Sequence, residues 1–408
     1  MLSYLLVYIC AAIMSQIAPR LSPNKKRPGV VVGTRDSVLA LAQTAIVEKF
    51  LRGKLGPEFE FGRQAIKTAG DKNQTVALHE MERKSLWTSE LEDMLVVHKV
   101  DIIVHSLKGL FNPFLTLTFA DDEFVDMPTM LPETCSLAAI LEREDPRDAF
   151  VVRAGHSYRS LSELPHGAII GSSSVRRMAQ VKRLYPHLVL VDCRGNVPSR
   201  LRKLDNVENL PQFNYDALIL AAAGLLRLGL GDRITEYLDA PEVLHAVGQG
   251  AIGIEIRAGD DEVVDILKGL THEPTALACY AERELLRTLE GGCSVPIGVK
   301  TTWDKDGSLH MLARVSSLDG TQNVEADERA RVSNQADAEA FGRTVAQKLV
   351  VGGCVPILEK IEADKTAKEK AKHAAEAAMA AAIPENDESG QLGESVVLVE
   401  SEDGGPSA

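Results

Sequence analysis

Basic and hydroxyl side chains follow several short apolar runs in this chain. Runs such as "GVVVGTR" and "GAIIGSSS" are expected to be strands, and a helical spacing of apolar residues follows each one. Ligands of α/β proteins bind beyond the carboxyl ends of such strands. The polar residues at these predicted ends are Arg35, Ser37, His105, Ser106, Ser172, Ser173, Ser174, Arg176, Arg177, Arg194 and Arg200.

The types of these side chains indicate a ligand with several negative groups. The "GSSS" segment opens a predicted helix, so it offers hydroxyls and backbone N–H groups beside a positive helix terminus. Guanidinium groups bind carboxylate or phosphate through two parallel hydrogen bonds. A single arginine of this kind is an ordinary solvated residue, but several at strand ends favour a binding site. The glycines match neither common nucleotide-binding pattern.

One cysteine stands apart from the other five. Cys293 follows Gly291 and Gly292 on a predicted loop, where its thiolate could act as a nucleophile or as an attachment point. A small buried hydrophobe is the equally open alternative. The six cysteines contain no C-x-x-C pair and no metal-ligand spacing, which predicts no metal, reduced thiols and a cytoplasmic setting.

Alternating strands and helices must position these side chains. The alternation predicts α/β architecture with mostly parallel sheets, and 408 residues allow two or three domains. The formal net charge of −13 argues against general binding of nucleic acid or of an anionic membrane surface. An Arg-rich site on an acidic chain therefore indicates a specific anionic ligand.

Six segments together resemble the porphobilinogen deaminase (hydroxymethylbilane synthase) family, and the similarity extends from about Gly29 to Lys360. They are "VHSLK", "EREDPRDAF", "GSSSVRRMAQ", "RGNVPSRLRKLD", "AVGQGAIGIE" and "LEGGCSVPIG". The resemblance implies three α/β domains, of which the first two have mixed, mostly parallel sheets like the lobes of type II periplasmic binding proteins. We expect domain 1 at 29–145 and 248–268, domain 2 at 146–243, and a smaller α+β domain 3, which carries the cysteine, at 272–362.

The resemblance also implies a chemistry. The family joins four porphobilinogen molecules head to tail into hydroxymethylbilane, with release of ammonia, on a dipyrromethane cofactor that a thioether would hold to Cys293. Each pyrrole carries an acetate and a propionate, which would explain the arginines. The implied cofactor- and substrate-binding residues are Arg35, Ser37, Lys84, Trp87, Ser106, Lys108, Ser172, Ser173, Ser174, Arg176, Arg177, Arg194, Gly195, Arg200, Arg227 and Gln249. Lys84 and Trp87 would belong to a flexible segment over the site. Loss of Arg176 or Arg177 is expected to hinder cofactor assembly or elongation more than folding.

The implied catalytic carboxylate is displaced in this chain. The family has an Asp directly after its H-S-x-K motif, where it stabilises the cationic azafulvene intermediate, but here Gly109 follows Lys108 and the motif resumes at Asp126. Residues 109–125 therefore form a predicted 17-residue insertion, either a retained intron or a genuine loop. The insertion leaves open a catalytically impaired isoform. A non-catalytic anion-binding protein is the other alternative.

The two ends of the chain lie outside the resemblance. Residues 1–28 are expected to be a disordered extension or to follow a misassigned start, since the apolar stretch there is too short to span a membrane. An Ala/Lys/Glu-rich helix and an acidic disordered tail are expected within 363–408. We expect a monomer that acts on porphobilinogen and binds neither nucleic acid nor membrane.

Overall fold

The computed structural model describes residues 29–67, 88–110, 126–128, 131–289 and 295–381. The chain divides into two compact units, Met1–Ala363 and Asp364–Ala408. Three sheets lie in the described part of the first unit. The predicted insertion, both termini, Lys84, Trp87 and Cys293 lie wholly or largely outside the described residues.

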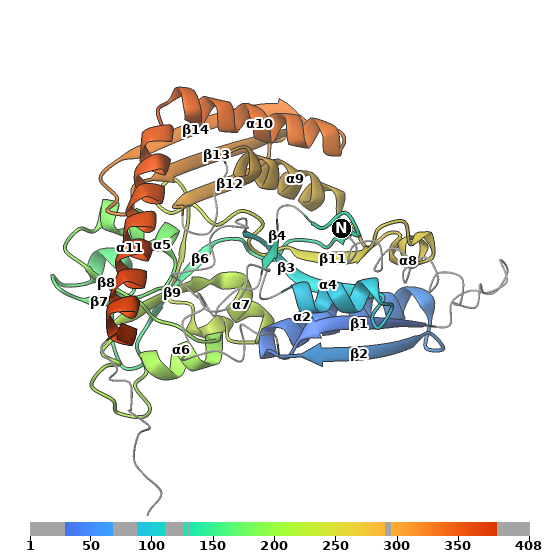
Figure 1. The fold of residues 1–408 in the computed structure, drawn as a ribbon, viewed down its shortest axis with the longest axis horizontal. Coiled ribbons are helices and arrows are strands. Elements are labelled where there is room, and N and C mark those ends of the chain that lie inside the picture. The colour runs from blue at the N-terminus through green and yellow to red at the C-terminus, as the bar shows by residue number, and fades with distance from the viewer. Residues whose placement is uncertain (1–28, 68–87, 111–125, 129–130, 290–294, 382–408) are drawn as a thin grey trace, which may run out of the picture. The chain divides into compact units, whose positions relative to one another are not determined.

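The first sheet has six strands in the described part of the chain, in the order β2-β1-β3-β11-β5 with β4 beside β3 (Figure 1). Its strands are β1 (Gly29–Arg35), β2 (Glu60–Ile66), β3 (Ile102–Leu110), β4 (Asp126–Pro128), β5 (Cys135–Ile140) and β11 (Ile252–Arg257). The helices that follow its strands are α2 (Val38–Leu55), α4 (Ser89–Val96) and α8 (Asp261–Leu267). β1 pairs in parallel with β2 and β3, whereas β11 is antiparallel to β3 and β5. The sheet is therefore mixed.

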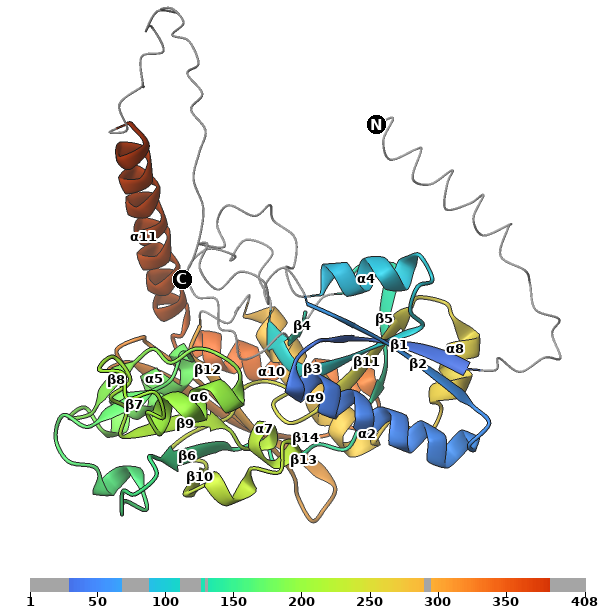
Figure 2. The same cartoon turned by 90° about the horizontal axis from the view of Figure 1, so that it is seen from below.

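The second sheet has the order β10-β6-β9-β7-β8 and lies beside the first (Figure 2). Its strands are β6 (Asp148–Val152), β7 (Ile169–Gly171), β8 (Val189–Val191), β9 (Ala217–Ala221) and β10 (Glu236–Leu238). Its helices are α5 (Val175–Leu184), α6 (Val197–Leu204) and α7 (Ala222–Arg227), with short 3-10 turns at Leu161–Glu163 and Gly231–Arg233. β7 is parallel to β8 and β9, and β6 is antiparallel to β9 and β10.

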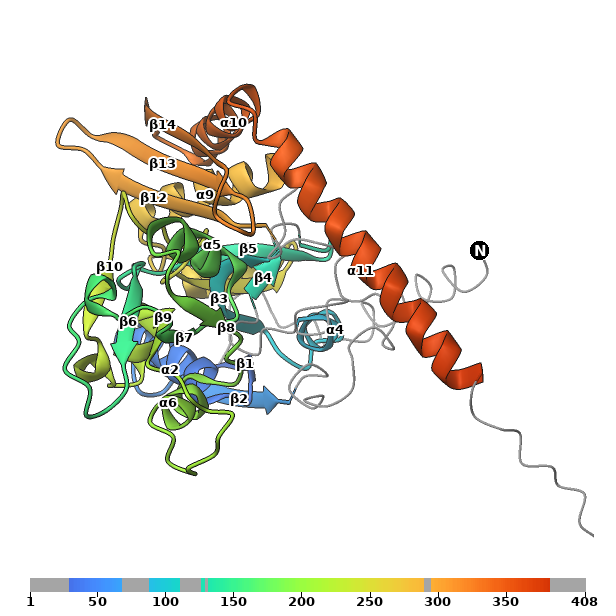
Figure 3. The ribbon, with the colours of Figure 1, turned by 90° about the vertical axis from the view of Figure 1, so that its left-hand side faces the viewer.

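The third sheet is a small antiparallel one. It consists of β12 (Ile297–Trp303), β13 (Ser308–Ser316) and β14 (Asn323–Arg331). The helices α9 (Glu273–Thr288) and α10 (Gln335–Val351) cover one face of it (Figure 3). The last helix, α11 (Val355–Ala381), begins in the first unit and continues into the second. It runs through part of the Ala/Lys/Glu-rich segment in which a helix was expected.

Local sequence explains why the site helices begin where they do. Ser37, Ser174 and Asn196 precede α2, α5 and α6, and each side chain accepts a hydrogen bond from a backbone N–H of the first turn. Such N-caps typically contribute about 1 kcal/mol. Each cap follows a strand of the same lobe, as the strand-then-helix pattern predicted. The caps therefore hold the helix N-termini at the strand ends where the site was expected.

A buried ionic cluster joins the three sheets. The Arg143 guanidinium donates to both carboxylate oxygens of Glu282, at 2.7 and 2.8 Å, and its Nε donates to the Gln249 carbonyl at 2.7 Å. The backbone N–H of Gly248 donates to the same Glu282 carboxylate at 2.7 Å. Gly248 has φ +68°, and a Cβ there would lie 2.1 Å from the Leu107 carbonyl oxygen, so no larger residue fits. The crossing segments are thus tied to α9.

Candidate active site

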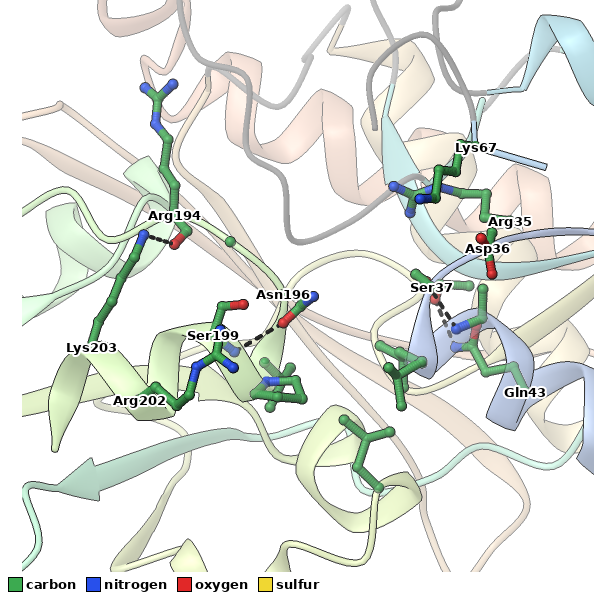
Figure 4. A pocket seen from close by; sticks show the side chains of 18 of the residues that line it. Arg35, Asp36, Ser37, Gln43, Lys67, Arg194, Asn196, Ser199, Arg202 and Lys203 are labelled. Atoms are coloured by element: carbon green, nitrogen blue, oxygen red, sulfur yellow. Dashed lines mark hydrogen bonds between the residues drawn. The ribbon is translucent and has the colours of Figure 1, made fainter. Parts of the chain in front are cut away.

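A cavity of about 610 Å³ lies between the first two sheets. Its lining comes from the end of β1, the middle of β3, the start of α2 and the segment around α6 (Figure 4). Five cationic side chains and two carboxylates line it, which leaves a surplus of positive charge on an acidic chain. They are Arg35, Lys67, Arg194, Arg202 and Lys203, with Asp36 and Glu208. The cavity therefore suits an anionic ligand.

Residues of the first sheet and of α2 form one side of this cavity. Arg35 ends β1, Ser37 caps α2, and Ser106 lies on β3. The side-chain amide of Gln43 donates to the Ser106 hydroxyl at 2.8 Å. Arg35, Ser37 and Ser106 were all predicted from their places at strand ends, and the structure brings them together.

Residues of the second sheet form the opposite side. The Arg194 Nε donates to Asp192 at 2.6 Å, and the Lys203 ammonium donates to the Arg194 carbonyl at 2.6 Å. Gly195, with φ +111°, makes the turn that leads into the Asn196 cap of α6. Arg194 and Gly195 were predicted site residues, and both line the cavity.

Arg176 and Arg177 do not line the cavity. Both are buried and bind Asp148 on β6, with contacts of 2.6 Å from Arg176 Nη1 and 3.0 Å from Arg177 Nε. Burial raises the pKa of Asp148, but the two guanidinium groups outweigh it and hold the pKa well below its usual range. Arg176 also donates to the Leu244 carbonyl, and Arg177 to that of Ile219. Carboxylate binding by these arginines stays a prediction.

Arg200 and the three serines form a second interior group. Arg200 is buried, and it donates to the Ser173 hydroxyl at 3.1 Å and to the Gly195 carbonyl. Ser172 and Ser173 are buried, and the Ser172 hydroxyl accepts from the backbone N–H of Ser174 at 3.2 Å. These residues support the turn that leads from β7 into α5. Ligand binding by these residues stays a prediction.

Arg227 is the last residue of α7, and Gln249 lies on the segment that leads from the second lobe back to β11. The Arg227 guanidinium donates to the Gly250 carbonyl at 2.6 Å, and burial lowers its pKa to about 10. The Gln249 amide donates to the Pro146 carbonyl at 2.6 Å and to Asp148 at 2.9 Å. Neither residue lines the cavity as the structure describes it.

The predicted catalytic residue is placed by its backbone alone. Asp126 begins β4 and is the register partner of Ser106, while Pro128 is the partner of Leu110. The two strands that flank the predicted insertion are thus neighbours in one sheet. Lys108 is half-buried on β3. The side chain of Asp126 lies outside the description, as do Lys84, Trp87 and Cys293.

Part of the cavity lining was not predicted from the sequence. Lys67 follows β2, a strand that the apolar pattern did not single out, because most of its residues are half-buried or exposed. Arg202, Lys203, Asn196 and Ser199 stand inside the quoted "RGNVPSRLRKLD" segment, but only the arginines 194 and 200 and Gly195 were selected there. A helical projection of α6 could have found the exposed members of this group.

The described cysteines lie outside the cavity. Cys135, Cys193, Cys279 and Cys354 are buried and form no disulfide with one another, and burial raises the pKa of the Cys135 and Cys279 thiols to about 12. No group of three or more His, Cys, Asp or Glu residues in the described ranges could hold a metal ion. Among the described helices, none has the length and apolar character that crossing a membrane requires.

Comparison with known proteins gives consistent matches over most of the chain. A sequence profile described as "Porphobilinogen deaminase, dipyromethane cofactor binding domain" matches residues 30–116 and 122–265, and the C-terminal domain profile of the same enzyme matches 276–350. The interruption between 116 and 122 falls inside the predicted insertion. The surplus of cations around the cavity fits a dipyrromethane, which carries carboxylates.

Relatives of similar length come from fungi and bacteria. Proteins named porphobilinogen deaminase from Yarrowia lipolytica and Synechococcus sp. are 48% and 46% identical to this chain. The two alignments each cover 82% of this chain, with 94% of the first relative and 96% of the second. A solved arginine transport periplasmic binding protein from Legionella pneumophila matches at TM-score 0.32 and 11% identity, over 63% of this chain and all of that one.

Proposed function

This chain belongs to the porphobilinogen deaminase family, and we propose that the cavity between its first two sheets holds the carboxylates of the growing pyrrole chain. The protein is a transferase that joins four porphobilinogen molecules head to tail into hydroxymethylbilane and releases ammonia, in tetrapyrrole biosynthesis. Its dipyrromethane cofactor supplies the acceptor to which the first unit is joined. The comparisons favour this enzyme over a non-catalytic anion-binding protein.

One observation carries the assignment of the site, namely the surplus of cations that face the cavity from two lobes. Arg35 and Ser37 on one side, and Arg194 on the other, would bind acetate and propionate groups by charge-assisted hydrogen bonds. The further proposed binding residues are Lys84, Trp87, Ser106, Lys108, Ser172, Ser173, Ser174, Arg176, Arg177, Gly195, Arg200, Arg227 and Gln249.

The described interior contacts divide this set into two roles. Arg35, Ser37, Ser106, Arg194 and Gly195 face the cavity and would touch the ligand directly. Arg176, Arg177 and Arg200 are buried among protein partners, so ligand contact would require them to exchange at least one of these. The buried arginines would therefore contribute less to ligand affinity than the residues that face the cavity.

Asp126 is the proposed catalytic carboxylate. A carboxylate beside the pyrrole N–H groups would stabilise positive charge as ammonia leaves, and it would do so most strongly where protein dipoles replace water. The backbone register with Ser106, a cavity-lining residue, supports this assignment because it keeps Asp126 on the strand next to the cavity.

Cys293 is the proposed attachment point of the cofactor. Intact-mass measurement and peptide mapping of purified protein should find dipyrromethane on Cys293 and on no other cysteine. Cys293→Ser should leave a folded but inactive apoprotein, whereas Cys279→Ser should keep the cofactor because burial holds the Cys279 thiol protonated. An unmodified Cys293 in active enzyme would refute the assignment.

The proposal also includes the domain boundaries, the oligomeric state and the cellular location expected from the sequence. The three domains would correspond to the three sheets, with the boundaries stated above. The protein would act as a cytoplasmic monomer without nucleic-acid or membrane partners. A catalytically impaired isoform is the second candidate, because the predicted insertion separates Lys108 from Asp126.

A further inference from the structure

The strand order of the first sheet places the polar residues of the cavity at increasing distances from β3. Ser106 lies on β3, Arg35 ends the neighbouring β1, and Lys67 follows β2 at the edge of the sheet. Register places Ile66 opposite Arg35, and the Asp36 N–H donates to the Ile66 carbonyl at 2.8 Å. Because neighbouring strands are about 4.8 Å apart, Lys67 lies about 10 Å from the line of β3.

The side chains of two cations of the cavity have neither a hydrogen-bond partner nor an ion-pair partner in the described part of the chain. Arg194 is engaged by Asp192, and Lys203 donates to the Arg194 carbonyl and lies over the Phe213 ring. The side chains of Lys67 and Arg202, by contrast, make no hydrogen bond or ion pair with any described residue. Both are exposed, and Figure 4 shows them on opposite sides. They form what we call the outer cation pair.

The reaction itself creates a need for such a pair. If every addition takes place at one carboxylate, each new ring must move the earlier rings away from that point. Every ring brings an acetate and a propionate, so negative charge accumulates outside the reaction centre as the chain grows. On this arrangement, cations close to β3 would bind the first rings, and cations farther from β3 would be needed only by later intermediates.

We propose that the outer cation pair, Lys67 and Arg202, binds the carboxylates of rings already added and so sustains the later additions. This inference rests on the proposed function, because it takes the growing pyrrole chain to be the ligand. It assigns the pair a specificity for intermediate length. Removal of its charges should spare the first addition and slow the third and fourth.

Adduct masses provide the first test. Lys67→Met and Arg202→Met remove the charge but keep an apolar stem, and Lys49→Met and Arg159→Met are matched controls because both residues are exposed and neither lines the cavity. Holoenzyme is mixed with four equivalents of porphobilinogen, quenched with acid at timed intervals and weighed intact. In the double variant we expect the first adduct at the parental rate, and an accumulation of two-unit adducts with later additions slowed at least tenfold. An adduct distribution like that of the controls, or equal slowing of all four additions, overturns the proposal.

A binding measurement separates this proposal from the proposed function. Benzenehexacarboxylate, used as a polycarboxylate probe in calorimetry, requires no turnover. We expect each Met substitution to weaken it about tenfold, which is about 1.4 kcal/mol, with the difference shrinking as salt rises. Unchanged probe affinity in both variants overturns the outer pair. A parental protein that binds the probe but forms no porphobilinogen adduct at all would instead count against the proposed function.

Discussion

Asp148 is the residue on which two predicted ligand-binding arginines converge. It is buried on β6, and Arg176, Arg177 and Gln249 all donate to its carboxylate. Breaking a buried ion pair by removing one partner typically costs about 3–5 kcal/mol, because the remaining charge stays in the interior without compensation. The arginines thus have a structural role that their sequence pattern did not disclose.

Asp148→Asn should therefore lower stability by about 3 kcal/mol or more, as measured by urea unfolding at pH 7. Asp304→Asn is a suitable control, since Asp304 forms an exposed pair with Arg329 and should change stability by less than about 1 kcal/mol. If Asp148→Asn unfolds at the parental urea concentration and fails only in porphobilinogen turnover, the cluster serves the ligand and not the fold.

Several residues that the sequence singled out lie together in the structure, although ligand binding by them stays a prediction. Arg35, Ser37, Ser106, Arg194 and Gly195 line the cavity as expected. The burial of the Arg176 side chain could not be predicted, because its partner Asp148 lies 28 positions away on β6. Pairing over such distances depends on tertiary packing, which a local pattern does not encode.

At the scale of elements, β3 and β4 are the strands on either side of the predicted insertion. The strands lie in parallel, with Ser106 opposite Asp126 and Leu110 opposite Pro128. Local pattern predicted the strand-to-helix units well, including α2, α5 and α6. It did not predict that β11 enters the first sheet antiparallel, because that direction depends on how the chain returns after building the second sheet.

Deletion of residues 109–125 should raise porphobilinogen consumption at equal folded concentration. The deletion makes Lys108 and Asp126 adjacent in sequence, and a misplacement of about 1 Å can cost on the order of a hundredfold in rate. We expect the full chain to be weakly active and poorly soluble, and the shortened chain to gain at least about tenfold in turnover.

Asp126→Ala in the shortened chain should then abolish turnover while leaving its unfolding curve unchanged. Equal turnover of the full and shortened chains would mean that the inserted residues are a tolerated loop. Full activity of the Asp126→Ala protein would move the catalytic role to another carboxylate, with Asp121 and Asp122 as the nearest candidates in sequence.

At the scale of the whole molecule, one junction ties the three sheets together. His245 forms a backbone bridge with Val299 of the third sheet and lies beside the Arg143–Glu282 pair. Its ring is buried, and Nδ1 lies 3.0 Å from the Ala246 carbonyl. Burial, and next the charge of Arg143, lower the pKa of His245 to about 4. The histidine is therefore neutral in the folded protein at physiological pH.

A neutral buried histidine makes stability depend on pH in a definite direction. Below the ordinary histidine pKa of about 6.5, His245 binds a proton in the unfolded chain but not in the folded one. The free energy of unfolding therefore falls as pH falls from about 6.5 toward 4. From pH 7 to pH 5 this single group should remove about 2 kcal/mol from the free energy of unfolding.

His245→Gln should flatten that pH dependence by about this amount, whereas His166→Gln, on an exposed residue, should not. Urea unfolding of the three proteins at pH 7 and pH 5 decides the matter through the difference between the two pH values, because any constant cost of the substitution cancels. Parallel pH profiles for the parent and His245→Gln would show that the junction admits the proton without opening.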